Sequence, residues 1–356
     1  MTKLNIAIDA MGGDDAPQMV IEGVARAIKK SDAHFIVFGD EAVLRPFIDR
    51  EPGLAEKITV RHTTDVITAD DKPSQAVRRG RKSSMGLAIQ SVKDGEAQVA
   101  VSAGNTGALM ALSKILLRMV PGIDRPAIAT PIPTQTGECL LLDLGANIEC
   151  SDKNLVQFAV MGAAYARVVF EIERPTLALL NVGVEELKGH DAVKSAGQIL
   201  KDTENLPMDF VGFTEGDGIS RGGIDVIVTD GFTGNVALKA TEGIARMIKG
   251  MLEEAFRSSW VTKLGYLLLR KGILKLRNEL DPNNHNGGVF LGLGGLVVKS
   301  HGGANARGFA SALKVAENMA KNDLNSLIME DLKNFSNAEN KASKNESDSS
   351  LQEKEK

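Results

Sequence analysis

Residues 98–109 read Gln-Val-Ala-Val-Ser-Ala-Gly-Asn-Thr-Gly-Ala-Leu, an apolar run that passes into a turn with two glycines and an asparagine. A short apolar run bounded by turn residues is typical of a strand buried on both faces of a parallel sheet. Glycine lets backbone N–H groups approach a ligand, and a helix that begins after such a turn adds its positive end. The stretch therefore predicts a strand, a ligand-binding turn and a helix, in that order.

The same pattern recurs along most of the chain, with short apolar runs alternating with longer amphipathic ones. This order is typical of βαβ units and predicts an α/β fold with a mostly parallel sheet between two layers of helices. We expect one α/β domain over residues 1–334, with two intertwined subdomains as an alternative, and a disordered tail over 335–356, where apolar side chains are almost absent. The expected strands are 4–9, 35–39, 98–102, 139–143, 177–181, 225–229 and 296–300, and the clearest helical patterns are 20–30, 75–94, 154–170 and 235–257.

Six of the expected strands end in polar or glycine-rich turns. In a parallel sheet the carboxyl ends of the strands share one edge, so we expect all six turns at the same edge, where open α/β folds bind ligands. Neutral donors and backbone amides gathered there would suit a phosphate or the oxyanion of a thioester under attack. For any single turn, backbone geometry alone explains the same residues. The six turns are 9–14, 102–107, 143–147, 181–189, 230–235 and 300–305.

Composition excludes several classes of protein. The formal net charge is −4 and aromatic residues make up 4% of the chain, so neither a basic field nor a set of stacking rings favours nucleic acid. No signal peptide precedes the first strand, and no apolar stretch is long enough to span a bilayer, so we expect a cytoplasmic protein. Its two cysteines, Cys139 and Cys150, indicate neither a disulfide framework nor a metal site.

Cofactor motifs are also missing. The turn after the first strand, Ala10-Met11-Gly12-Gly13-Asp14, lacks the glycine spacing of a dinucleotide site, and its carboxylates would repel a pyrophosphate. Neither a Walker A motif nor the Gly-x-Ser-x-Gly elbow of serine hydrolases occurs. We therefore expect neither a cofactor nor a metal.

Taken together, the turns resemble the phosphate acyltransferases, the acyl-ACP:phosphate acyltransferases of bacterial phospholipid synthesis, from Asn5 to about Met319. The resemblance implies a phosphotransacetylase-like fold related to the isocitrate and isopropylmalate dehydrogenases. It also implies a homodimer that transfers a long-chain acyl group from acyl carrier protein to inorganic phosphate. Gly80, where the family has a basic residue, and Val184, where it has a small or polar one, depart from the pattern. The matching segments are 8–14 with Pro17, 73–85, 101–109, 142–147, 229–236 and 301–304.

On this hypothesis phosphate is the nucleophile, and the protein positions it and stabilises the oxyanion. Asn105, Thr106 and the Gly104 backbone would form one wall of a phosphate cradle. By similarity to phosphotransacetylases, Asn235 and the Gly234 amide would contact phosphate or carbonyl. Further candidates for phosphate or substrate binding are Asp9, Gly12, Gly13, Asn147, Gly302 and Gly303.

Two titratable side chains complete the candidate catalytic set. Lys188 would neutralise phosphate, and His301 would protonate the leaving thiolate. Each has a structural alternative, because Lys188 can be a solvated loop lysine, His301 can bond a loop carbonyl, and Asp9 can cap its turn. A cysteine nucleophile is disfavoured, since no base is placed to activate Cys150 and Cys139 fits a buried strand.

Residues 259–280 form a basic amphipathic segment. Tyr266, Leu269 and Ile273 share one face of a helical projection, with Arg270 and Lys271 outside it. Such a segment can lie in a membrane interface or contact the acidic carrier protein, and it can equally pack in a dimer or a core. Gly265 and Gly272 predict a break into short helices.

Two other functions remain open at this point. A short-chain phosphotransacetylase acting on coenzyme A esters would share the chemistry, and a thioester-plus-phosphate assay separates the two. A lipid-surface scaffold would explain residues 259–280 but none of the six turns.

Overall fold

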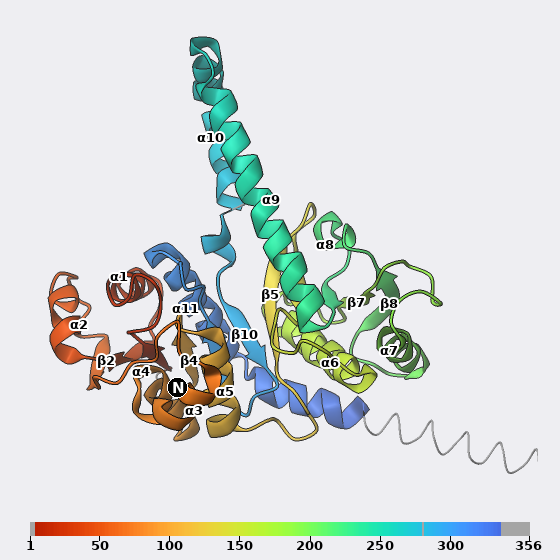
Figure 1. Cartoon of the computed structure of the whole chain (residues 1–356), viewed down its shortest axis with the longest axis horizontal. Coiled ribbons are helices and arrows are strands. Elements are labelled where there is room, and N and C mark those ends of the chain that lie inside the picture. The colour runs from red at the N-terminus through yellow and green to blue at the C-terminus, as the bar shows by residue number, and fades with distance from the viewer. Residues whose placement is uncertain (1–3, 280, 336–356) are drawn as a thin grey trace, which may run out of the picture.

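The computed structural model describes residues 4–279 and 281–335, and it contains one 11-stranded sheet with helices on both faces (Figure 1). The strand order is β3-β2-β1-β4-β11-β10-β5-β6-β9-β7-β8. Most neighbours are parallel, so the predicted α/β class and mostly parallel sheet are confirmed. All but the first residue of the predicted tail lies outside the described residues.

Four of the strands were not predicted from the sequence, namely β3, β5, β8 and β10, whereas the seven expected strands are all present. The strands are β1 (Asn5–Asp9), β2 (His34–Gly39), β3 (Ile58–His62), β4 (Val99–Ser102), β5 (Ala127–Pro133), β6 (Glu138–Leu142), β7 (Thr176–Leu180), β8 (Asp209–Thr214), β9 (Val226–Val228), β10 (Gly288–Leu291) and β11 (Leu296–Lys299).

Long amphipathic helices alternate with these strands. The helices are α1 (Gln18–Ala27), α2 (Glu41–Ile48), α3 (Pro73–Arg79), α4 (Ser84–Lys93), α5 (Thr106–Leu117), α6 (Asp152–Val169), α7 (Asp191–Asp202), α8 (Gly218–Arg221), α9 (Gly231–Arg257), α10 (Trp260–Glu279) and α11 (Ala306–Lys321), with short 3₁₀ turns η1 (Gly80–Lys82) and η2 (Pro282–His285).

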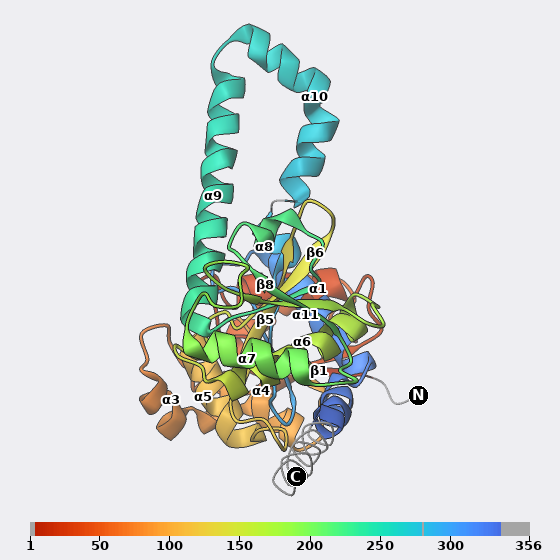
Figure 2. The same cartoon turned by 90° about the vertical axis from the view of Figure 1, so that its right-hand side faces the viewer.

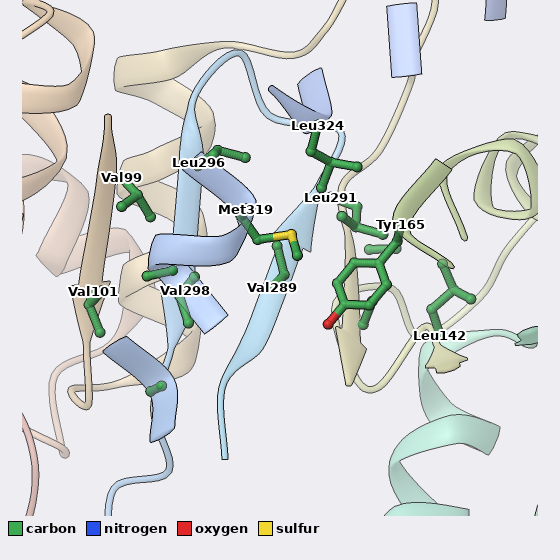
Figure 3. Close-up of a cluster of buried hydrophobic side chains, with 14 of the residues drawn as sticks. Val99, Val101, Leu142, Tyr165, Val289, Leu291, Leu296, Val298, Met319 and Leu324 are labelled. Carbon is green, nitrogen blue, oxygen red and sulfur yellow. The ribbon is translucent and has the colours of Figure 1, made fainter. Parts of the chain in front are cut away.

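Two hydrophobic cores lie on the two faces of the sheet, because successive side chains of a strand point to opposite faces. Val99 and Val101 of β4 belong to the core under α1, α6 and α11, and Ala100 between them belongs to the core under α4 and α5. Figure 3 shows the first core, where Met319 and Tyr165 meet the valines and leucines of the central strands. This alternation produces the predicted three layers (Figure 2).

The direction of the strands reverses within the sheet. Strand β10 is antiparallel to both β11 and β5, and β5 is antiparallel to β6. These three antiparallel pairings leave β1, β4 and β11 running one way and β6, β9 and β7 running the other. The prediction that all six turns emerge at one edge is therefore wrong: the turns form two groups of three, one at each edge of the ladder.

The predicted helix over residues 75–94 is also wrong as a single element, because α3, η1 and α4 divide it. The division falls at Gly80, which is buried; a Cβ there would lie 2.7 Å from Ile67 Cδ1 and 3.2 Å from Leu112 Cδ1. Ser83 then caps α4 by accepting a hydrogen bond from Gly86 N. A larger side chain at position 80 has no room here.

Helices α9 and α10 form a hairpin that projects from the body (Figure 1). Contrary to the prediction, α10 is continuous through Gly265 and Gly272. Tyr266 packs on Phe256 of α9, with ring centroids 5.4 Å apart, so tertiary contact offsets the poor helix propensity of glycine. Within the described residues, no helix combines the length and the apolar character that a membrane span requires.

Candidate active site

The first group of turns follows β1, β4 and β11 and is organised by the buried Asp9. Ser102 Oγ donates to Asp9 Oδ2 at 2.7 Å and accepts from Gly104 N at 3.0 Å. A Cβ on Gly12 would lie 2.5 Å from Asp9 Oδ2 and 2.7 Å from Gly104 N, so only glycine allows this approach. Burial raises the pKa of Asp9, while Ser84 and Ser102 oppose the shift. Asp9 therefore orients the turn, and its carboxylate lies beneath it.

Asn105 caps α5 with its own side chain. Its Oδ1 accepts from Ala108 N at 3.0 Å, and its Nδ2 donates to the carbonyl oxygens of Ala69 at 2.7 Å and Asp71 at 3.3 Å. The amide is thus engaged on both sides by the protein. Thr106 is exposed at the first position of α5, where backbone N–H groups are left for an anion.

The loop after β11 packs on the loop after β1. Asp14 N donates to Gly302 O at 3.0 Å, and a Cβ on Gly13 would lie 3.4 Å from the same oxygen. Gly303 N donates to His301 Nδ1 at 3.1 Å, which places the proton of a neutral imidazole on Nε2. Burial lowers the pKa of His301, and Lys239 and Lys299 lower it further, so the neutral form prevails at neutral pH.

Lys299 lies under this group and was not predicted from the sequence. Its Nζ donates to Ala103 O at 3.0 Å and to Ser300 O, and the side chain is half-buried. Burial lowers the pKa of Lys299 to about 8, and Lys239 acts in the same direction, whereas Asp9 and Asp14 act in the opposite one. A cation is therefore held directly behind the Ala103–Gly104 peptide.

The second group follows β6 and β9 and is organised by the buried Asp143. This carboxylate accepts from Ile128 N at 2.9 Å, Ala146 N at 3.0 Å and Asn147 N at 2.8 Å. Asn147 is buried, and its Nδ2 donates to Asp143 and to Pro126 O. The turn is thus shaped by internal hydrogen bonds that engage the Asn147 amide nitrogen.

The start of α9 sits on that turn. Gly231 N donates to Asn147 O at 2.7 Å, and a Cβ on Gly234 would collide with the Asp143 carbonyl oxygen. Asn235, the next residue, is exposed, and its side chain lies over Gly145. Glycine therefore lets α9 approach closely enough to present the Asn235 amide to solvent.

Lys188 lies in the loop after β7, at the same edge as Asn235. It is exposed and pairs with Glu185 at 2.9 Å, and this partner raises the pKa of Lys188. Asn181 Nδ2 donates to Lys188 O at 3.0 Å and closes the loop. The ammonium can exchange Glu185 for another anion, because both side chains of the pair are exposed to solvent.

Helix α9 connects the two groups. Lys239 lies one turn after Asn235 on the same helix face. It is close enough to His301 and Lys299 to lower the pKa of both. The first turns of α9 therefore face the loop after β11, although β9 and β11 run in opposite directions.

The two thiols are poor nucleophiles. Burial is the main cause that raises the pKa of Cys139 and of Cys150 to about 12. Within the part of the chain that the structure describes, His, Cys, Asp and Glu side chains nowhere gather in a group of three that could hold a metal ion. The site therefore offers backbone amides, neutral side-chain donors and lysines.

Comparisons with known proteins agree with this chemistry. The model of the family described as "Fatty acid synthesis protein" matches residues 4–327. The phosphate acyltransferase of Rhodospirillum rubrum is 51% identical over 330 residues, which cover 92% of this chain and 94% of the relative. That of Parvibaculum lavamentivorans is 53% identical over 335 residues, covering 94% and 92%. The chain belongs to the phosphate acyltransferase family.

The EutD phosphotransacetylase from Staphylococcus aureus has a similar fold, with a TM-score of 0.60 at 15% identity over 89% of this chain and 94% of that one. The predicted phosphotransacetylase-like fold is confirmed. The sequence of this chain did not point to Lys299, Lys239 or Asp143. A polar residue at the end of an apolar strand was the available signal for Lys299 and Asp143, and the i,i+4 spacing from Asn235 was the signal for Lys239.

Proposed function

We propose that the protein transfers a long-chain acyl group from the thioester of acyl carrier protein to inorganic phosphate. An oxygen of hydrogenphosphate attacks the thioester carbonyl carbon and a tetrahedral oxyanion forms. The C–S bond then breaks to give acyl-phosphate and the carrier thiolate, which becomes the free thiol with the proton that the phosphate loses. The observation that carries this proposal is the match, over nine tenths of the chain, to proteins named phosphate acyltransferase. The product is an activated acyl donor for phospholipid biosynthesis.

Phosphate would bind at the first group of turns. The Thr106 N–H at the start of α5 provides a donor without charge, and Gly302 and Gly303 would let the anion approach the loop after β11, whereas the Gly104 N–H is held by Ser102 Oγ. Lys299 supplies positive charge from behind the turn. Asp9 and Asn147 hold the two turns and act as positioning residues.

The thioester would lie between the two groups. The exposed Asn235 amide would donate to the carbonyl oxygen as it becomes an oxyanion, a donor worth about 3–4 kcal/mol in a prepared site. Lys188 and Lys239 would neutralise the phosphate as it attacks. Since neutral imidazole carries its proton on Nε2, His301 would donate a hydrogen bond to the leaving sulfur rather than a full proton.

The test is thiol release from long-chain acyl carrier protein and from acetyl-coenzyme A, each with and without phosphate. We expect phosphate-dependent release from the carrier substrate at least about tenfold faster than from acetyl-coenzyme A. A preference for acetyl-coenzyme A would identify a short-chain phosphotransacetylase. No phosphate-dependent release from either would refute the acyltransferase.

We further propose that the α9–α10 hairpin brings the enzyme to a membrane surface and joins two copies into a homodimer. Near its tip, Trp260 and Leu268 are 77% and 81% exposed, and Lys263, Arg270 and Lys271 are exposed beside them. Apolar and basic side chains together favour an anionic lipid interface.

The predicted contact face of this segment is divided by the fold. Leu269 is 59% exposed, whereas Tyr266 and Ile273 are half-buried, and Tyr266 packs against α9. The outward face consists instead of Leu264, Leu267 and Leu268.

The shaft of α9 carries a separate stripe of exposed apolar residues, which fits a helix of a second copy. An exposed apolar stripe at helical spacing favours contact with an apolar partner. Its residues are Ile244, Met247, Ile248 and Met251.

Flotation with anionic vesicles tests the tip, using Leu268→Glu and, as a control, Val211→Glu on β8. We expect only the first variant to lose flotation; equal, negligible flotation of all three proteins would remove the membrane role.

Sedimentation of Met247→Glu/Met251→Glu tests the dimer, for which we expect a monomer from this variant and a dimer from wild type. A monomeric wild type would refute the dimer.

A further inference from the structure

A basic surface lies beside the first group of turns, where we propose that phosphate binds. Between Asp71 and Asp94 the chain contains no Asp or Glu, although the protein as a whole has a net charge of −4. Within the described part of the chain, none of the five basic side chains of this surface forms an ion pair with a carboxylate, and all five are exposed. They are Lys72, Arg78, Arg79, Arg81 and Lys82, on α3 and η1.

The basic surface differs from the lysines on and just before α7. Lys188, Lys194 and Lys201 each pair with a nearby carboxylate. A pair of this kind cancels most of the field that either charge would exert on a partner. The five unpaired charges on α3 and η1 add their fields instead.

The basic surface is rigidly attached to α5. Ala76 and Gly80 are buried, and Gly80 faces Leu112 of α5 so closely that a Cβ would lie 3.2 Å from Leu112 Cδ1. The arginines therefore point away from α5, and they move with the helix that begins at Asn105.

Both ends of the segment connect to the candidate site. At one end, the Asn105 amide donates to the carbonyls of Ala69 and Asp71, directly before Lys72. At the other end, Ser84 follows the basic run, is buried, and opposes the rise in the pKa of Asp9. A macromolecule bound to this surface would thus lie next to the first group of turns.

We propose that the basic surface is the docking site of the acidic carrier protein, which presents its thioester to the site from there. This inference rests on the proposed function. Complementary charge raises the rate of encounter and fixes orientation, and both matter for a substrate whose reactive group is carried on a large acidic protein. Nucleic acid is a poorer match, because aromatic residues for base stacking are scarce in the chain.

Charge reversal tests the docking site in two arms, Arg78→Glu/Arg79→Glu and Arg81→Glu/Lys82→Glu. The matched control is Lys29→Glu/Lys30→Glu, an adjacent exposed pair after α1 on the opposite face of the sheet. A third arm, Arg270→Glu/Lys271→Glu, tests the hairpin as the alternative carrier contact. Each protein is assayed with acyl carrier protein and with an acyl-phosphopantetheine that lacks the protein, and binding of the free carrier is measured by fluorescence anisotropy.

We expect both α3–η1 variants to lose about tenfold in kcat/KM for the carrier substrate, mainly through KM, and to bind the free carrier more weakly by a similar factor. Turnover of acyl-phosphopantetheine should stay within about twofold of wild type, and added salt should weaken the wild type more than the variants. Equal losses on both substrates would show a structural defect and overturn the proposal, as would unchanged carrier binding or a loss confined to the hairpin variant. If the wild type turns over neither substrate, the proposed reaction fails, whereas the anisotropy measurement still decides whether this surface binds the carrier.

Discussion

Helices α5 and α9 both begin just after a strand and both have an asparagine at or near their first turn, yet they use this asparagine differently. Asn105 is the cap of α5, and its side-chain amide forms hydrogen bonds with the backbone of Ala108, Ala69 and Asp71. In α9 the cap is Asp230, which accepts from Thr233 N at 2.8 Å, and Asn235 is exposed. The comparison indicates that Asn105 shapes a turn, whereas Asn235 is available to a substrate.

Replacing Asn235 by alanine should give the largest effect on activity. Loss of one prepared oxyanion donor should lower kcat by about 10²–10³-fold, with little change in thermal stability, because the side chain is exposed and only lies over Gly145. Initial rates of thiol release and a melting curve check both parts. Near-normal turnover would show that Asn235 has no role in the reaction.

Asn105→Ala should affect activity less and stability more. Loss of the cap and of the hydrogen bonds to residues 69–71 should lower the free energy of unfolding by about 1–2 kcal/mol. Displacement of the Gly104 turn should lower turnover by at least about tenfold. Urea unfolding and kinetics on the same preparation test this. If Asn105→Ala kept full stability while Asn235→Ala unfolded, the roles assigned to the two asparagines would be reversed.

Much of the fold could be predicted because buried parallel strands leave a local signal. Runs such as Leu177–Leu180 are apolar on both faces, and each is followed by a turn. Strands β5 and β10 were not found, since β5 contains Thr130 and two prolines and β10 begins at a glycine. These two strands reverse the direction of the sheet, so the single-edge prediction was wrong for a reason that no apolar run reveals.

The two groups of turns can still approach each other, because sheets twist. At a typical twist of about 20–25° per strand, the five pairings from β4 to β9 would together rotate the strands by about a right angle or more. This rotation partly cancels the reversal in direction, in agreement with the proximity of Lys239 to His301. The glycines and Asn235 could be found from the sequence because their turns are local, whereas the burial of Lys299 depends on contacts between β11 and the end of β4.

The pH dependence of the reaction should show the titration of the half-buried Lys299. Lys299 has its pKa lowered to about 8, while Asp9, Asp14, Lys239 and His301 face the same region. As pH rises through this value the ammonium loses its proton, so kcat/KM for phosphate should fall about fivefold between pH 8 and 9. Lys299→Met should be less active at pH 7 and should lack this fall. An identical alkaline limb in the variant would assign the titration to another group.

The smallest effect concerns the exposed pair of Lys188 and Glu185. If Lys188 serves phosphate, Glu185 competes for the ammonium, because the two side chains lie 2.9 Å apart and carry opposite charges. Glu185→Gln should therefore lower KM for phosphate by about twofold, a change limited by solvent screening of the pair. Lys188→Ala should move the same parameter in the opposite direction and lower kcat, as expected for a group that contacts the transferring phosphate. A higher KM in Glu185→Gln would contradict this competition and show that Glu185 holds Lys188 in position for the anion.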